Sequence, residues 1–481
     1  MNYNELFNMC GLDDEWQAQN KERIEKFLYQ MYIRSDQDIA DSVAWTKKQY
    51  DTSLPSTRQF LAVLMKEAMD YALARDEREI IINYTRPTMA SLSQGFHVWE
   101  NRINAELGYN KFYARGTSIV YLMIVLGTIF NKANWCIELS EDLGQTAGKG
   151  HCSEYQIWEG ALFKGMIPAP DVEVSCGLFC DQAPEVEAKM AVDYNFDVVF
   201  TDLPEDHPWD TWPHMDINAI KYLSKNTEAV YDYLREKYGF TMSEDDKSQG
   251  VLEANQFITA HMAIVNLVAT TDGLPVSHAD MFLSFISAAI GSVYKDEVLA
   301  AMKQMQKDIR KRIREESFIV PPGAPRAYGT FVAVADMRFY HQVEEAGIHL
   351  THVWFEPIPP EVFSTPPASD IPREQGYEMI FRFQGLGDLC GSSIKQARFA
   401  VENFNLDGLM IFETMFCRPL CLPSVQIKDY VQKHCNNIPV MRLELDAYDS
   451  RNYTPEQYRT RLESFAEVMR MRKAMKEISA I

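Results

Sequence analysis

The stretch DVEVSCGLFCDQAPEVEAKMAVDYNFDVVFT, residues 171–201, decides the fold. It begins with a β-rich run over 171–175, continues with a helical pattern over 183–194, and ends with a second β-rich run over 197–201. Two strands joined through a helix form a parallel pair with a right-handed crossover. This unit therefore predicts an α/β fold with a parallel sheet.

The last third of the chain carries the same alternation. It follows a proline-rich turn at 321–325 and closes with a helical pattern at 455–479. Between them we expect strands at 329–335, 349–355, 408–413 and 438–444, and helices at 339–346, 394–403 and 423–434. The segment 357–372 is rich in proline, and its structure is not indicated. Two α/β halves of similar design indicate a duplicated architecture.

Helical patterns dominate the remainder. Apolar residues recur at helical spacing over 14–31, 36–50, 56–75, 217–238, 252–270, 280–290 and 295–316. We therefore expect three parts: a helical N-terminal extension (1–134), a first α/β domain (135–322), and a second α/β domain with a C-terminal helix (323–481). The expected fold class is α/β, with two Rossmann-like domains built on parallel sheets behind the extension.

The composition is that of an acidic globular protein. Of the 481 residues 46% are hydrophobic and 24% charged, and the net charge of -21 disfavours nucleic acid or an anionic membrane as a partner. The longest apolar stretch, 119–130, is shorter than the roughly 20 residues that span a bilayer, and the first residues carry no secretory signal. We expect a cytoplasmic protein whose nine cysteines are thiols or metal ligands rather than disulfides.

Two cysteines follow expected parallel strands, at the edge where α/β proteins bind ligands. Cys180 follows the strand at 171–175, Cys417 follows the strand at 408–413, and each precedes a helix. The positive end of such a helix favours thiolate over thiol. Cys152, in a glycine-rich segment upstream of the first strand, is a third candidate. Three thiolates from three loops can hold one iron-sulfur cube with one iron left open.

Most cysteines in globular proteins are small buried hydrophobes. We expect that role for Cys10, Cys136 and Cys435. The chain has no compact CxxC ladder, so spacing alone leaves both roles open for the three candidate ligands.

Several segments, taken together, resemble one known family. The C-terminal ones are LDGLMIFETMFCRP (406–419), IPV (438–440) and DAYDSRNYTPEQYRTRLESF (446–465), and the central ones are EDLG (141–144), HCS (151–153), PAPD (168–171), CD (180–181) and DLP (202–204). In order and spacing they are similar to the 2-hydroxyacyl-CoA dehydratase and benzoyl-CoA reductase family of anaerobes. The likeness spans 135–470.

This resemblance implies that Cys152, Cys180 and Cys417 bind a 4Fe-4S cluster. It implies a subunit of an ATP-activated 2-hydroxyacyl-CoA dehydratase, which pairs with a homologous second subunit or with itself. A separate ATP-hydrolysing iron-sulfur activator supplies a low-potential electron in that family. The electron enters the thioester of an acyl-CoA substrate as a ketyl radical anion, which loses the hydroxyl group or, in the reductases, is protonated. Neither the acyl group nor the catalytic residues are indicated.

Some features depart from the family pattern and leave a different cluster open. Glu205 stands where many relatives have tyrosine, Phe416 stands where they have serine, and the first 134 residues match poorly. Further thiols are present at Cys176, Cys390 and Cys421. Six thiols would suffice for a double-cubane 8Fe cluster, as in an ATP-dependent reductase branch of the superfamily.

The alternatives to the dehydratase are a benzoyl-CoA-reductase-like oxidoreductase, which is the runner-up, and a non-catalytic partner subunit. A nucleotide-binding Rossmann enzyme is disfavoured, because neither strand-to-helix turn carries GxGxxG or a P-loop lysine.

Three more residues lie near the expected site. His151 is adjacent to Cys152, His207 follows the second strand of the first α/β unit, and Glu413 ends the strand before Cys417. His151 could hydrogen-bond the cluster or substrate, and Glu413 could carry a proton. A structural role is the favoured interpretation for both.

Overall fold

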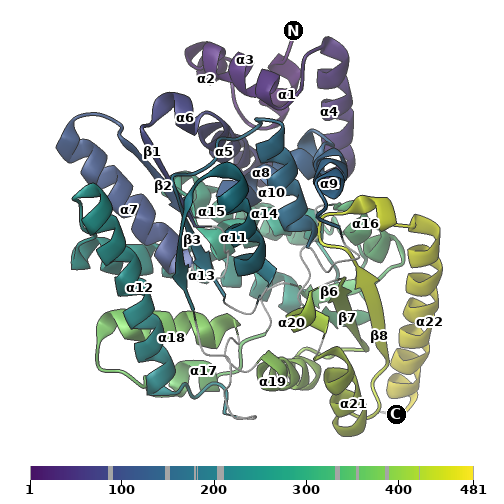
Figure 1. Ribbon diagram of the computed structural model, residues 1–481. Coiled ribbons are helices and arrows are strands. Elements are labelled where there is room, and N and C mark those ends of the chain that lie inside the picture. Colours follow the sequence, from purple (N-terminus) through teal and green to yellow (C-terminus); the bar gives the residue numbers. More distant parts are fainter. Residues whose placement is uncertain are drawn as a thin grey trace.

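The structure is a computed structural model that describes residues 2–84, 90–116, 118–146, 152–177, 180, 182–202, 211–330, 336–353, 357–384, 389–415, 417–421 and 423–479. Two parallel sheets lie in one body, each flanked by helices (Figure 1). This confirms the expected α/β class with two Rossmann-like sheets.

The first sheet contains β1 (Ile80–Tyr84), β2 (Phe112–Gly116), β3 (Val172–Cys176) and β4 (Asp197–Thr201). The second contains β5 (Arg326–Gly329), β6 (His349–His352), β7 (Gly408–Thr414) and β8 (Val440–Leu445). Their orders, β2-β1-β3-β4 and β6-β5-β7-β8, are the same permutation, and every pairing is parallel. In both sheets the direction of winding therefore reverses between the first and third strands, and ligands of open α/β sheets bind beyond such a point.

Helices fill the connections. The N-terminal part contains α1 (Asn4–Met9), α2 (Asp14–Gln19), α3 (Lys21–Gln30), α4 (Asp36–Gln49), α5 (Pro55–Ala72) and α6 (Ala74–Glu77). Within the first α/β unit lie α7 (Ala90–Leu107), α8 (Ser118–Ile124), the π-helical η1 (Val125–Ile129), α9 (Ala133–Asp142), α10 (Ser153–Phe163) and α11 (Gln182–Tyr194).

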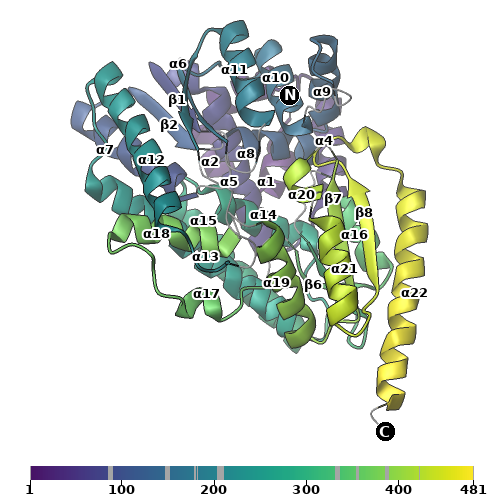
Figure 2. The ribbon, with the colours of Figure 1, turned by 60° about the horizontal axis from the view of Figure 1, so that its bottom comes forward.

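The two sheets are linked by α12 (Ile217–Tyr238), α13 (Glu244–Thr270), α14 (His278–Ile290) and α15 (Lys295–Arg314). The second unit has α16 (Arg338–Glu345), α17 (Glu361–Ser364), α18 (Pro372–Gln384), α19 (Leu389–Asn403), α20 (Arg418–Cys421), α21 (Ser424–His434), the 3-10 helix η3 (Ser450–Asn452) and α22 (Pro455–Ser479). The long helix α22 runs along the outside of the second unit (Figure 2).

One expected helix begins earlier than its apolar pattern indicates. The apolar spacing starts at 252, whereas α13 begins at Glu244. Ser243 accepts a hydrogen bond from the backbone of Asp246, and the Asp246 side chain accepts one from the Ser243 backbone. This capping box satisfies the free backbone donors of the first turn and extends the helix into a polar segment.

The expected N-terminal extension is not separate from the first sheet. Strands β1 and β2 lie within residues 1–134, and β1 pairs directly with β3. Across the other expected boundary, Tyr377 and Phe381 of α18 pack in the same apolar cluster as side chains of the first sheet. The sheets and cores therefore cross the limits expected at 134 and 322. The segment 357–372, whose structure the sequence did not indicate, contains α17, and the expected strand residues 331–335 and 354–355 lie outside the described residues.

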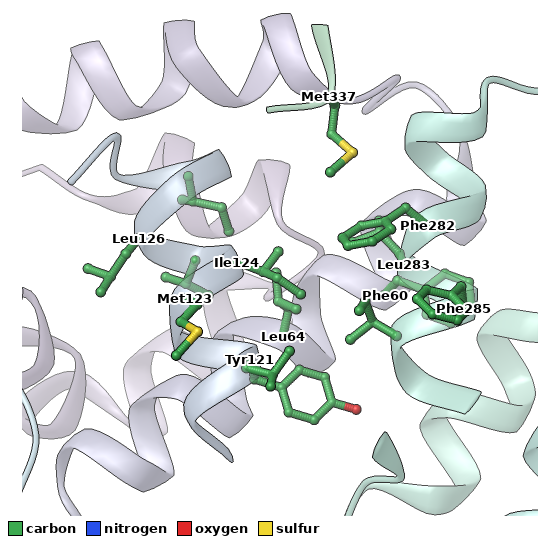
Figure 3. Close-up of a cluster of buried hydrophobic side chains, with 14 of the residues drawn as sticks. Phe60, Leu64, Tyr121, Met123, Ile124, Leu126, Phe282, Leu283, Phe285 and Met337 are labelled. Carbon is green, nitrogen blue, oxygen red and sulfur yellow. The ribbon is translucent and has the colours of Figure 1, made fainter. Parts of the chain in front are cut away.

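The apolar stretch 119–130 forms the centre of the main core. Its residues in α8 and η1 pack against α5 and α14, as Tyr121, Ile124, Phe60 and Phe282 illustrate (Figure 3). In the part of the chain that the structure describes, no single helix is long and apolar enough to cross a membrane. Residues 119–129 reach the length and apolar character of a membrane span only when α9 is added, and the two segments meet at a bend of 114°.

Candidate functional site

Cys180 and Cys417 lie at equivalent places in the two sheets. Each follows the third strand of its sheet, which is β3 for Cys180 and β7 for Cys417, and that strand adjoins the first strand at the switch point. The amide of each cysteine bonds to the carbonyl three residues before it. The Cys180 amide donates to the Gly177 carbonyl at 3.2 Å, and the Cys417 amide donates to the Thr414 carbonyl at 3.0 Å.

Cys152 comes from a different element, the N-terminus of α10. It is the N-cap residue of this helix, and its carbonyl accepts a hydrogen bond from the Gln156 amide at 3.2 Å. Its side chain is partly buried against the main core, as is that of Cys180. The thiol is thus held at the start of a helix whose remaining length is largely buried.

The Cys152 thiol lies in an environment that disfavours its charged form. Burial holds the pKa of the Cys152 thiol well above its usual range, and negative charge on Glu154, Cys180 and Cys417 raises that pKa further. The structure thus places the three cysteines that the sequence singled out at the start of α10 and beyond the ends of β3 and β7. All three are free of disulfides. Their role as metal ligands stays a prediction.

The donor set differs from that of a single-ion site. Among the described residues, no group of three His, Cys, Asp or Glu side chains converges on one metal ion. A four-iron cube does not require such convergence, because each thiolate binds a different iron at a separate corner.

The additional cysteines occupy other environments. Cys176 is 1% exposed. Its side chain shares one face of β3 with those of Val172 and Val174, and all three belong to the same apolar cluster. The Cys421 thiol donates to the Thr414 carbonyl at 3.1 Å. Cys390 packs against a third apolar cluster. As expected, the remaining three are buried thiols, namely Cys10, Cys136 and Cys435.

Glu413 has a local partner. It is buried and forms an ion pair with Arg442 of the neighbouring strand β8, whose Nε lies 2.8 Å from Oε1. This ion pair agrees with the structural role that the sequence favours for Glu413. His151 and His207 lie outside the described residues.

A polar group beside Cys152 has no counterpart among the residues predicted from the sequence. The Ser153 hydroxyl, on the first residue of α10, donates to Asp446 Oδ1 at 2.6 Å, and Tyr448 is buried nearby. Burial, Glu154 and Cys152 raise the pKa of the Tyr448 hydroxyl well above its usual range. Asp446 and Tyr448 belong to the segment DAYD that resembles the family. This motif was the one feature of the sequence that could have pointed to them.

A comparison with protein-family models supplies an independent result. The model for HGD-D, the 2-hydroxyglutaryl-CoA dehydratase D-component, matches residues 149–469, which is more than half of the chain and includes all three candidate ligands. A comparison with curated proteins gives no match. The chain therefore belongs to the 2-hydroxyglutaryl-CoA dehydratase D-component family, a subunit type of 2-hydroxyacyl-CoA dehydratase enzymes.

Proposed function

We propose that this chain is the cluster-binding subunit of an ATP-activated 2-hydroxyacyl-CoA dehydratase, with Cys152, Cys180 and Cys417 as ligands of one 4Fe-4S cluster. The observation that carries the proposal is the place of these cysteines, at the start of α10 and after the third strand of each sheet, within the region that matches the family. When bound, such a cluster supplies single electrons for the elimination of water from a 2-hydroxyacyl-CoA thioester.

The environment of the thiols fits this group. Partly buried thiolates that share one site need compensating positive charge, which iron supplies. Three protein ligands leave a fourth iron without a cysteine. The partial exposure of all three thiols is compatible with access of a substrate or an added ligand to that iron.

The same residues hold the site in place. Cys152 and Cys180 rest against the main apolar core, which excludes water from one side of the thiols. Cys417 comes from the second sheet, so the cluster would join the two α/β units. The D-component family implies a partner component, and we propose a homologous subunit together with an ATP-hydrolysing iron-sulfur activator.

A double-cubane 8Fe cluster is less well supported. It would recruit Cys176, Cys390 and Cys421, yet Cys176 packs in an apolar cluster with Val172 and Val174, and the Cys421 thiol donates to a backbone carbonyl. Recruiting them would require the end of β3 and the turn of α20 to rearrange.

The test is an anaerobic assay of the complex with activator, ATP, reductant and 2-hydroxyglutaryl-CoA. We expect a 2-enoyl-CoA product with wild-type protein and none with Cys417→Ala. A thioester-dependent change in the electron-spin spectrum of the cluster is the second expected result. A complex that contains iron but yields neither product nor spectral change with a panel of 2-hydroxyacyl-CoA thioesters would overturn the dehydratase assignment.

A further inference from the structure

The segment Asp446–Arg451, which we call the clasp, leaves the end of β8 and contacts the first α/β unit. Asp446 Oδ1 accepts hydrogen bonds from the amides of Tyr448 and Asp449 at 3.1 and 2.9 Å. Asp449 in turn caps η3 by accepting from the Arg451 amide at 2.9 Å. The carboxylates of Asp446 and Asp449 therefore fix the backbone conformation of the clasp through hydrogen bonds within the segment itself.

Three sets of polar contacts join the clasp to α9 and α10. Ser153 donates to Asp446 at 2.6 Å, and the Ser153 hydroxyl also accepts from the Tyr448 amide at 3.1 Å. Asn134 and Ser450 exchange two hydrogen bonds, at 2.8 and 3.2 Å. Arg451 binds both carboxylate oxygens of Glu141, each at 2.8 Å.

These contacts complete a short route between Cys152 and Cys417. Ser153 is next to Cys152, and it bonds Asp446, which is next to Leu445. The Leu445 carbonyl accepts from the Met415 amide at 2.7 Å, and Met415 lies two residues before Cys417. One side-chain and one backbone hydrogen bond thus connect the neighbourhoods of two thiols that lie in different α/β units.

We propose that Ser153 and Asp446 are positioning residues that set the distance between Cys152 and Cys417. The inference rests on the proposed function in one respect, because the distance matters for a cluster that both thiols bind. Ser153 is buried, so removal of its hydroxyl takes a donor from a partly buried carboxylate at a position that water does not readily reach. Cys180 shares its α/β unit with Cys152, so its distance to Cys152 does not depend on the clasp.

The experiment uses cluster-free, reduced full-length protein and a short bis-maleimide, with cross-linked peptides quantified by mass spectrometry. The Cys152–Cys180 cross-link is the internal reference, and the Cys152–Cys417 cross-link is the readout. In Ser153→Ala and Asp446→Ala we expect the ratio of readout to reference to fall about fivefold or more. Ser153→Thr and Asp446→Asn should restore it, because a hydroxyl donor and an Oδ1 acceptor remain.

Ser140→Ala is the matched control. It removes another buried serine-to-carboxylate hydrogen bond, from Ser140 to Glu159 at 2.7 Å, which ties α9 to α10 without touching the clasp. Its cross-link ratio should equal that of the wild type. An equal ratio in Ser153→Ala and wild type, with both folded by circular dichroism, would overturn the proposal.

A second readout separates this inference from the proposed function. In reconstituted protein, iron loss to a chelator should be several-fold faster in Ser153→Ala than in Ser140→Ala or Ser153→Thr. If wild-type protein takes up no iron while the cross-link ratio still falls, the cluster proposal fails and the clasp stands. If iron binds but neither the cross-link ratio nor the rate of iron loss changes, the clasp fails and the cluster proposal stands.

Discussion

The two sheets have the same strand order, but their second strands bury ionisable groups in different ways. On β2, the second strand of the first sheet, Arg115 is 5% exposed and contacts the carboxylates of Glu67, Asp70 and Glu100. On the corresponding strand β6, His352 is 1% exposed, and burial together with the charge of Arg326 lowers its pKa to about 3. One strand therefore keeps a compensated charge, and the other keeps a neutral ring.

The comparison extends to the thiols at the switch points. Both sheets present a cysteine after the third strand, whereas the added thiol Cys152 comes from the first unit alone, through α10. The shared strand order therefore fixes one candidate cysteine in each unit. The helices between the strands decide whether a unit contributes a further one. Substitutions at corresponding positions of the two units test these likenesses and differences.

The largest effect is expected at the two equivalent thiols. Cys180→Ala and Cys417→Ala should each remove nearly all of the bound iron, because a cube that loses one of three protein ligands is held by only two thiolates. Iron per chain and visible absorbance after anaerobic purification measure this. Retention of a full cluster by either variant would break the proposed equivalence of β3 and β7.

The next effect concerns stability. Arg115→Met should destabilise the fold by about 3 to 5 kcal/mol, because it leaves buried carboxylates without their shared cation. His352→Phe, at the corresponding strand, should cost less than about 1.5 kcal/mol at neutral pH, since the neighbouring rings of Tyr328 and Phe404 accept another aromatic side chain. Urea unfolding of both variants measures the difference. Equal losses of stability in the two variants would contradict the view that Arg115 is needed to compensate the buried carboxylates around β2.

A smaller effect depends on pH. The folded-state pKa of His352 lies below that of the unfolded chain, so the unfolded state binds the proton first and stability falls as pH drops below about 6.5. At pH 5 the loss should be about 2 kcal/mol relative to pH 7. His352→Phe should lack that part of the loss, although His349 remains. Unfolding curves of the two proteins at pH 7 and pH 5 provide the test, and equal losses on acidification would contradict it.

The smallest effect is expected at the accompanying thiols. Cys176→Ala and Cys421→Ser should keep the wild-type iron content, because their side chains face an apolar cluster and a backbone carbonyl. Cys176→Ala should still lower stability by about 1 kcal/mol through the small cavity it leaves. A halved iron content in either variant would instead favour the larger cluster.

The sequence predicted β3, β4, β7 and β8 because each is rich in β-branched or other apolar residues and lies next to a helical segment. β2 was missed because Arg115 interrupts its pattern, and only tertiary partners make a buried arginine acceptable. α18 was missed because it follows a proline-rich stretch, and its burial depends on packing with helices that precede it by more than a hundred residues.

The candidate thiols could be located for a related reason. A cysteine just after a strand needs only the local pattern and the rule that strand ends bind ligands, so Cys180 and Cys417 were found. The link between Ser153 and Asp446 joins residues 293 positions apart and has no local signature. Such contacts become visible only in three dimensions.

The most direct test of the central claim is the iron and acid-labile sulfide content of anaerobically purified protein, with its electron-spin spectrum. One cluster on Cys152, Cys180 and Cys417 predicts about four iron and four sulfide per chain, lost together in each single alanine variant. About eight iron per chain, or a chain that takes up none after reconstitution, would contradict it.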